Sequence, residues 1–151
     1  MKIKNGRIII NEDCLEFNLK SLEKDLRNFF KNDKRFSHYD IGVFVEFDGD
    51  CWNEETHRCW NELTINIVNY DIMVELGGQL AGEKRFAFST ISYTTDTFEP
   101  QLVMNNGEPE FYFVFNWASS CITNSVTWQN NRDEETVEDI VGDILTAWYE
   151  V

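Results

Sequence analysis

The segment from Phe47 to Trp60 brings together side-chain types that bind metal ions, catalyse reactions and contact partner proteins. Three kinds of site use such a mixture, namely a calcium loop, a zinc site and a protein-contact surface. The chemically relevant residues are Asp48, Asp50, Cys51, Trp52, Glu54, Glu55, His57, Cys59 and Trp60.

A calcium loop would begin at Asp48-Gly49-Asp50, but the remaining spacing does not fit. The established loop requires an oxygen ligand at its fifth position, glycine at the sixth and glutamate at the twelfth. Those positions are occupied here by Trp52, Asn53 and Cys59. The spacing therefore argues against a calcium site.

A zinc site could use Cys51, His57 and Cys59, with Cys14 or Cys121 as a fourth ligand. A strong zinc pattern contains two cysteines separated by only a few residues, and this segment lacks such a pair. The alternative is that Cys51 and Cys59 are small, buried apolar residues. A zinc site is therefore the weaker interpretation, and we predict no cofactor.

A protein-contact surface explains the segment better. An exposed tryptophan supplies an anchor for binding, and neighbouring carboxylates supply complementarity to a basic partner. The competing interpretation is that both tryptophans pack on the edge of a sheet, with the acids as a solvated rim. The predicted contact residues are Asp48, Asp50, Trp52, Glu54, Glu55 and Trp60.

An enzymatic function has little support in the sequence. His38 and His57 are the only histidines, and so the only ordinary candidates for a base near neutral pH. No nucleophile-elbow, zinc-protease or phosphate-loop motif occurs, and the glycines within residues 77–82 suit a turn between strands. We predict a non-enzymatic protein without catalytic residues.

Charge is distributed unevenly along the chain. Residues 1–36 contain nine basic residues and six carboxylates, a net charge of +3, whereas residues 37–151 contain four and 21, a net charge of −17. Such an acidic body attracts cationic surfaces over a distance, and it lacks the basic face that neutralises phosphates. We expect a basic protein partner, with no direct contact to nucleic acid or membrane.

The location of the protein follows from three further observations. No apolar run approaches the length of a membrane span, and the N-terminus does not resemble a secretory signal. The even count of four cysteines permits disulfides, but their density is low and no signal peptide is evident, so we expect reduced thiols. We expect a cytoplasmic protein with a single domain over residues 1–151.

Hydrophobic periodicity predicts an α+β fold, with a single antiparallel sheet of about five to six strands and an N-terminal and a C-terminal helix packed on it. A turn at Ala118-Ser119-Ser120 is expected to join the last two strands. The predicted strands are residues 7–10, 41–47, 63–67, 70–76, 85–94, 111–117 and 122–128. The N-terminal helix is indicated by Leu19, Leu22, Leu26, Phe29 and Phe30, which recur at helical spacing.

The predicted C-terminal helix carries a second acidic surface. No lysine or arginine follows Arg132, whereas surface helices usually interleave charges to gain ion pairs. Its apolar stripe is Val137, Ile140, Val141, Ile144, Leu145 and Trp148. The acidic residues that we add to the predicted binding surface are Glu135, Glu138, Asp139 and Asp143.

In general character the chain resembles the small acidic immunity proteins of bacterial polymorphic and contact-dependent toxin systems. The resemblance rests on the acidic body after residue 36, the 47–60 segment and the acidic final helix, and it includes no diagnostic motif. It implies a protein inhibitor that neutralises a cognate basic toxin, often a nuclease. Two alternatives stay open: a phage anti-defence protein, such as an anti-CRISPR, that blocks a nucleic-acid-binding effector, and a Cys/His metal-binding protein or enzyme.

Overall fold

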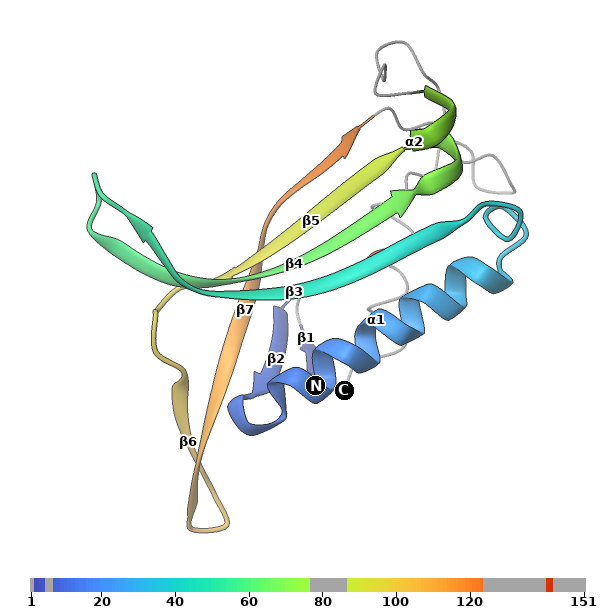
Figure 1. Ribbon diagram of the computed structural model, residues 1–151. Coiled ribbons are helices and arrows are strands. Elements are labelled where there is room, and N and C mark those ends of the chain that lie inside the picture. The colour runs from blue at the N-terminus through green and yellow to red at the C-terminus, as the bar shows by residue number, and fades with distance from the viewer. Residues whose placement is uncertain (1, 5–6, 77–86, 124–140, 143–151) are drawn as a thin grey trace.

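Seven antiparallel strands form one sheet, and the long helix α1 packs on one of its faces (Figure 1). The computed structural model describes residues 2–4, 7–76, 87–123 and 141–142. Six strands follow the order β1-β2-β7-β5-β4-β3, and β6 pairs with the first part of β7. The elements are β1 (Lys2–Lys4), β2 (Arg7–Asn11), the 3-10 turn η1 (Glu12–Cys14), α1 (Leu15–Asn32), β3 (Ile41–Asn53), β4 (Arg58–Asn69), α2 (Tyr70–Leu76), β5 (Phe88–Thr95), β6 (Gln101–Asn105) and β7 (Glu108–Thr123).

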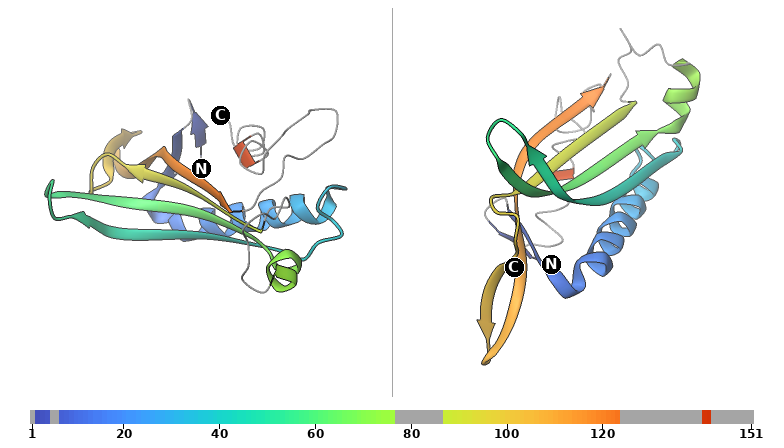
Figure 2. Two further views of the ribbon diagram at one scale, coloured as in Figure 1. Left: turned by 90° about the horizontal axis from the view of Figure 1, so that it is seen from above. Right: turned by 60° about the vertical axis from the view of Figure 1, so that its left-hand side comes forward.

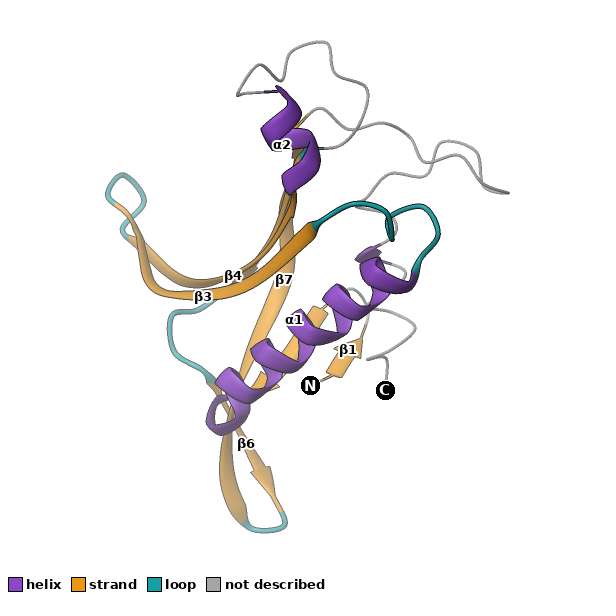
Figure 3. Ribbon diagram, turned by 45° about the vertical axis from the view of Figure 1, so that its right-hand side comes forward, coloured by secondary structure: helices purple, strands orange, loops and turns teal. Residues whose placement is uncertain are grey.

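Helix α1 buries the apolar stripe that its sequence predicts. Leu19, Leu22, Leu26 and Phe30 recur every three or four residues, share one side of the helix and are buried. Burial of each such side chain contributes about 1.5–3 kcal/mol. The helix runs next to β3 (Figure 3). The sheet residues in the same core are Ile3, Ile8, Ile10, Val43, Val45, Leu63, Ile65, Ile67, Ile91, Tyr93, Phe113 and Phe115. The predicted α+β fold, with one antiparallel sheet and an N-terminal helix, is confirmed.

The free edge of β3 is closed by two side chains of α1. The Val43 carbonyl accepts a hydrogen bond from Arg27 Nε at 3.1 Å, and the Val45 N–H donates to Glu23 Oε2 at 3.1 Å. Arg27 and Glu23 also form an ion pair at 2.9 Å. The pair satisfies backbone groups that a neighbouring strand would otherwise bond, so this part of the edge is protected from pairing with another chain.

Residues 70–76 form the short helix α2, so the prediction of a strand there is wrong. Asn69 caps the helix, because its Oδ1 accepts a hydrogen bond from the Ile72 N–H at 3.2 Å. Asp71 lies in the first turn, where the helix dipole favours negative charge. Ile72 is fully buried whereas Val74 is 80% exposed. The alternating apolar residues therefore do not share a buried face, and the cap outweighs their β propensity.

Strand β7 is continuous through Ala118-Ser119-Ser120, so the predicted turn there is wrong. The register with β5 shifts at this point: Tyr93 lies opposite Trp117, and Ser92 lies opposite Ser119. A β-bulge thus absorbs the extra residue without reversing the chain. Residues 124–128, the end of the last predicted strand, lie outside the described residues.

The predicted C-terminal helix lies outside the described residues, apart from residues 141 and 142. Val141, a member of its apolar stripe, is fully buried and belongs to the core formed by α1 and the sheet. Within the described ranges, no helix has both the length and the apolar character needed to cross a membrane.

Candidate functional site

The chemically rich segment 47–60 forms the outer part of the β3–β4 hairpin, at the left of Figure 1. It was expected to lie between two strands, but the strands continue through it: β3 ends at Asn53 and β4 begins at Arg58. The pairs Trp52–Cys59 and Asn53–Arg58 close the hairpin. Strand alternation, and not an irregular loop, therefore decides which way each side chain points.

Asn53 fixes the turn at the tip of the hairpin. Its Oδ1 accepts hydrogen bonds from the N–H groups of Glu55 and Thr56 at 3.0 and 3.1 Å, which is an Asx turn. His57 completes the turn with a left-handed backbone, φ 54°. The turn holds Glu54 and Glu55 in solvent at the end of the hairpin.

A β-bulge lies between the tip and the main sheet. The register shifts between Asp48 and Cys51, and Asp50 adopts a left-handed φ of 61°. Asp48 pairs with Glu62 and Cys51 pairs with Trp60, so all four side chains share a face. Strict alternation would have placed Asp48 and Cys51 on opposite faces. The bulge thus brings a thiol next to two carboxylates.

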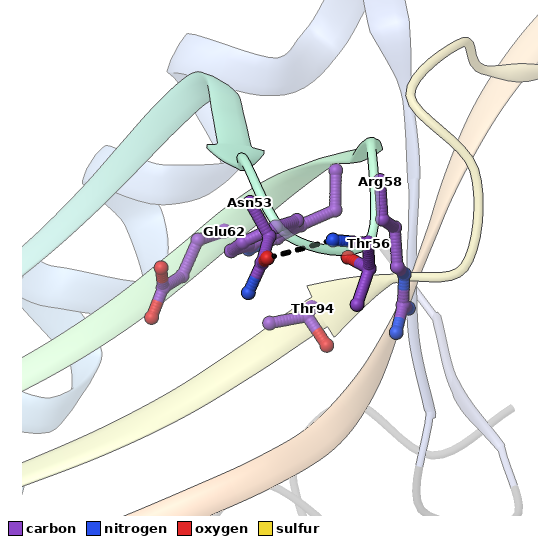
Figure 4. A pocket seen from close by; sticks show the side chains of 6 residues that line it. Asn53, Thr56, Arg58, Glu62 and Thr94 are labelled. Atoms are coloured by element: carbon purple, nitrogen blue, oxygen red, sulfur yellow. Dashed lines mark hydrogen bonds between the residues drawn. The ribbon is translucent and has the colours of Figure 1, made fainter.

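This face of the hairpin is turned away from α1, because its residues alternate with Leu63 and Ile65 of the core. It bears a hollow of about 380 Å³. Glu62 and Arg58 lie at opposite ends of the hollow (Figure 4). The residues that line it are Asn53, Thr56, Arg58, Trp60, Glu62 and Thr94.

Carboxylates far outnumber cations on the hairpin. Arg58 is the only lysine or arginine between residues 46 and 62, and it has no ion pair with any residue that the structure describes. The structure brings together four predicted acids and adds two that the sequence analysis did not select. The exposed carboxylates are Glu46, Asp48, Asp50, Glu54 and Glu55, and Glu62 is half-buried.

The Cys51 thiol lies close to Asp48 and Glu62. Its Sγ lies 3.6 Å from the Asp48 carbonyl oxygen and 3.9 Å from Glu62 Oε2. Partial burial, followed by the negative charges of Asp48 and Glu62, raises the pKa of the Cys51 thiol above its usual value. This shift disfavours a nucleophilic role for Cys51, because the thiolate is the reactive form of a cysteine.

The zinc-ligand candidates Cys51, His57 and Cys59 do not fit a metal site. Cys51 lies opposite Trp60 and Cys59 lies opposite Trp52, so the two thiols project from opposite faces of the hairpin. No group of three metal-ligand side chains occurs in the part of the chain that the structure describes. The free cysteines are Cys14, Cys51, Cys59 and Cys121.

The other predicted contact residues differ in their exposure, and some lie outside the described residues. Trp52 is 53% exposed, and its ring lies 5.7 Å from that of His57. Trp60 is half-buried beside the hollow. The acids of the predicted C-terminal helix lie outside the described residues: Glu135, Glu138 and Asp139, and also Asp143.

Sequence reasoning missed Glu46, Glu62 and the hollow beside them. Glu46 lies within the predicted strand 41–47, and Glu62 directly precedes the predicted strand 63–67. The period-two alternation of a strand places both side chains on the face away from the core. That signal was present in the sequence. The hollow had no such signal, because it depends on the pairing of β4 with β5, which brings Thr94 opposite Glu62.

Comparison of the chain with protein-family models, with curated proteins and with solved structures finds no match. The site must therefore be interpreted from its own geometry and charge.

Proposed function

We propose that this chain is a non-enzymatic protein inhibitor of the immunity type, which binds and neutralises a basic toxin domain. The β3–β4 hairpin would be its principal contact surface. One observation carries the proposal: a projecting hairpin with a single arginine carries five exposed carboxylates and the exposed Trp52. An aromatic anchor on a strongly acidic hairpin is complementary to a cationic protein surface.

The backbone of the hairpin supports this role. The Asx turn at Asn53 and the bulge at Asp50 fix the tip, so little conformational entropy would be lost on binding. The acids would also steer a cationic partner and raise its association rate above the unsteered range of about 10⁵–10⁶ M⁻¹s⁻¹.

The partner is to be captured with the full-length chain from its native host and identified by mass spectrometry. We expect a basic protein, and association that slows as salt rises, because exposed charges act through screened attraction. Recovery of a bacterial toxin supports the immunity function, whereas a nucleic-acid-binding defence effector would support the anti-defence alternative. A partner that is not basic would overturn both.

Charge reversal locates the contact surface. Replacement of Asp48, Asp50, Glu54 and Glu55 by lysine should slow association with the captured partner and leave the fold unchanged by circular dichroism. The matched control replaces four exposed acids elsewhere by lysine: Glu12, Glu16, Asp40 and Glu108. Each reversal adds two positive charges, so both variants change the net charge from −14 to −6. If association slows equally in both variants, net charge and not the hairpin governs binding.

A further inference from the structure

The hairpin formed by β6 and the first part of β7 projects from the sheet away from the β3–β4 hairpin (Figures 1 and 2). We call residues 101–111 the β6–β7 arm. Every residue of β6 is exposed, including Leu102 at 57% and Met104 at 62%. An isolated two-stranded hairpin has only marginal stability in water. An arm with so much apolar surface would gain stability from a partner.

The turn of the arm determines where its backbone groups point. Asn106 and Gly107 both have positive φ, 53° and 81°, as in a type I′ turn between the paired residues Asn105 and Glu108. Residues that flank such a two-residue turn exchange hydrogen bonds, and the direction then alternates along the strand. The N–H and C=O groups of Leu102 and Met104 are therefore directed away from β7, towards the free edge of β6.

The two faces of the arm differ in polarity. Leu102 pairs with Phe111 and Met104 pairs with Pro109 on one face, which continues into the core residue Phe113 on the same strand. The other face is more polar: Val103 lies opposite Glu110, which accepts hydrogen bonds from the Tyr112 hydroxyl and from Asn105 Nδ2. The arm therefore presents an ordered apolar face beside an open backbone edge.

Three other free edges of the described sheet each carry a feature that discourages pairing with another chain. The edge of β3 is covered in part by Glu23 and Arg27, and its outer part carries acids. Strand β1 is short and contains two lysines, and the first part of β7 contains Pro109 between two glutamates. Charge, proline and short length are the usual means of blocking an edge. Strand β6 has none of them, because residues 101–107 are uncharged.

The geometry points to β6 as a homodimerisation edge, where it pairs antiparallel with β6 of a second copy. A two-fold axis at Val103 would place Leu102 opposite Met104 of the partner, and Gln101 opposite Asn105 of the partner. The outward N–H and C=O groups of Leu102 and Met104 would then bond across the axis, and their side chains would share one apolar face. The sheets of the two copies would become continuous.

The charge distribution favours a second copy over a basic protein as the occupant of this edge. Two chains with a net charge of −14 repel each other over most of their surface. The uncharged stretch 101–107 allows close approach without opposing carboxylates at the contact. A basic partner, in contrast, would gain nothing from an uncharged strand and would favour the acidic β3–β4 hairpin. The dimer does not depend on the proposed inhibitory function.

The test is the mass of the full-length chain in solution, measured by light scattering and sedimentation over a range of concentrations. We expect a concentration-dependent dimer of twice 17.8 kDa. Added salt should strengthen the dimer, because it screens the repulsion between the copies, whereas binding of a basic partner should weaken. A chain that stays monomeric at all concentrations and salt levels would overturn the inference.

Two substitutions in β6 test whether this strand forms the dimer interface. Val103→Lys should convert the dimer to monomer, because it places like charges opposite each other at the axis. Val74→Lys is the matched control, since Val74 is exposed on α2 and the charge change is the same. Met104→Pro removes an outward N–H without disturbing the bonds to β7, and should also abolish the dimer. A dimer that survives both Val103→Lys and Met104→Pro would place the interface elsewhere.

Discussion

Trp52 and Trp60 lie on opposite faces of the β3–β4 hairpin, although they flank the same short turn. Trp52 pairs with Cys59, and Trp60 pairs with Cys51, so the alternation of the strands separates the two rings. Trp52 is 53% exposed, whereas Trp60 is half-buried at the hollow. A single flat interface cannot use both rings equally, and we assign the anchoring role to Trp52.

Trp52→Ala should therefore weaken partner binding and leave the free energy of unfolding almost unchanged. An interfacial tryptophan contributes about 2 kcal/mol or more, which corresponds to about a thirtyfold increase in Kd. Trp60→Ala should show the reverse pattern, with a loss of stability of about 1–2 kcal/mol, below the loss typical of fully buried tryptophans. Titration calorimetry and urea unfolding measure the two quantities. A binding loss confined to Trp60→Ala would reverse the assignment.

Asn53→Ala should loosen the tip of the hairpin. It removes the acceptor for the N–H groups of Glu55 and Thr56, and each such hydrogen bond contributes about 0.5–1.5 kcal/mol. We expect faster amide hydrogen exchange at both residues and slower formation of the partner complex. Asn53→Asp keeps an acceptor oxygen at this position and is the control that should preserve the protection. Unchanged exchange in Asn53→Ala would show that the turn does not depend on this side chain.

Glu23→Ala should expose the edge of β3. The Val45 N–H would lose its acceptor and Arg27 would lose its ion pair. Because the Glu23 side chain is only 25% exposed, we expect the free energy of unfolding to fall by about 1 kcal/mol. The open edge should also increase aggregation on storage. Glu23→Gln keeps an acceptor oxygen without the charge and should retain part of the stability, so an equal loss in both variants would assign the effect to charge alone.

Cys51 should react slowly with iodoacetamide at neutral pH, because its raised pKa keeps the thiol protonated. A thiol whose pKa is higher in the folded state stabilises the fold below its unfolded pKa. That contribution is lost as the pH rises through the folded value. Glu62→Gln removes one source of negative charge and should lower the pKa, so alkylation of Cys51 should accelerate. Peptide mass spectrometry measures the rate, and no acceleration would mean that Glu62 does not control this thiol.

The sequence by itself determined the α+β class, the antiparallel character of the sheet and the buried stripe of α1. Each depends on a periodicity of apolar residues that is local to one segment. Leu19, Leu22, Leu26 and Phe30 define a helix face whatever they pack against, and the alternation in residues 41–47 and 63–67 persists in β3 and β4. The acidic character of the candidate surface was likewise visible as composition.

The tertiary structure decided the features that depend on pairing and capping. The cap at Asn69 turned an alternating segment into α2, and the bulge near Ser119 carried β7 through a predicted turn. The bulge at Asp50 placed Asp48 and Cys51 on one face, and alternation put Cys51 and Cys59 on opposite faces. The strand β6 was not predicted, because a five-residue run is stabilised as a strand only by its pairing with β7. Local periodicity fixes which way a side chain points within its own element, but its neighbours depend on strand register, which long-range contacts establish.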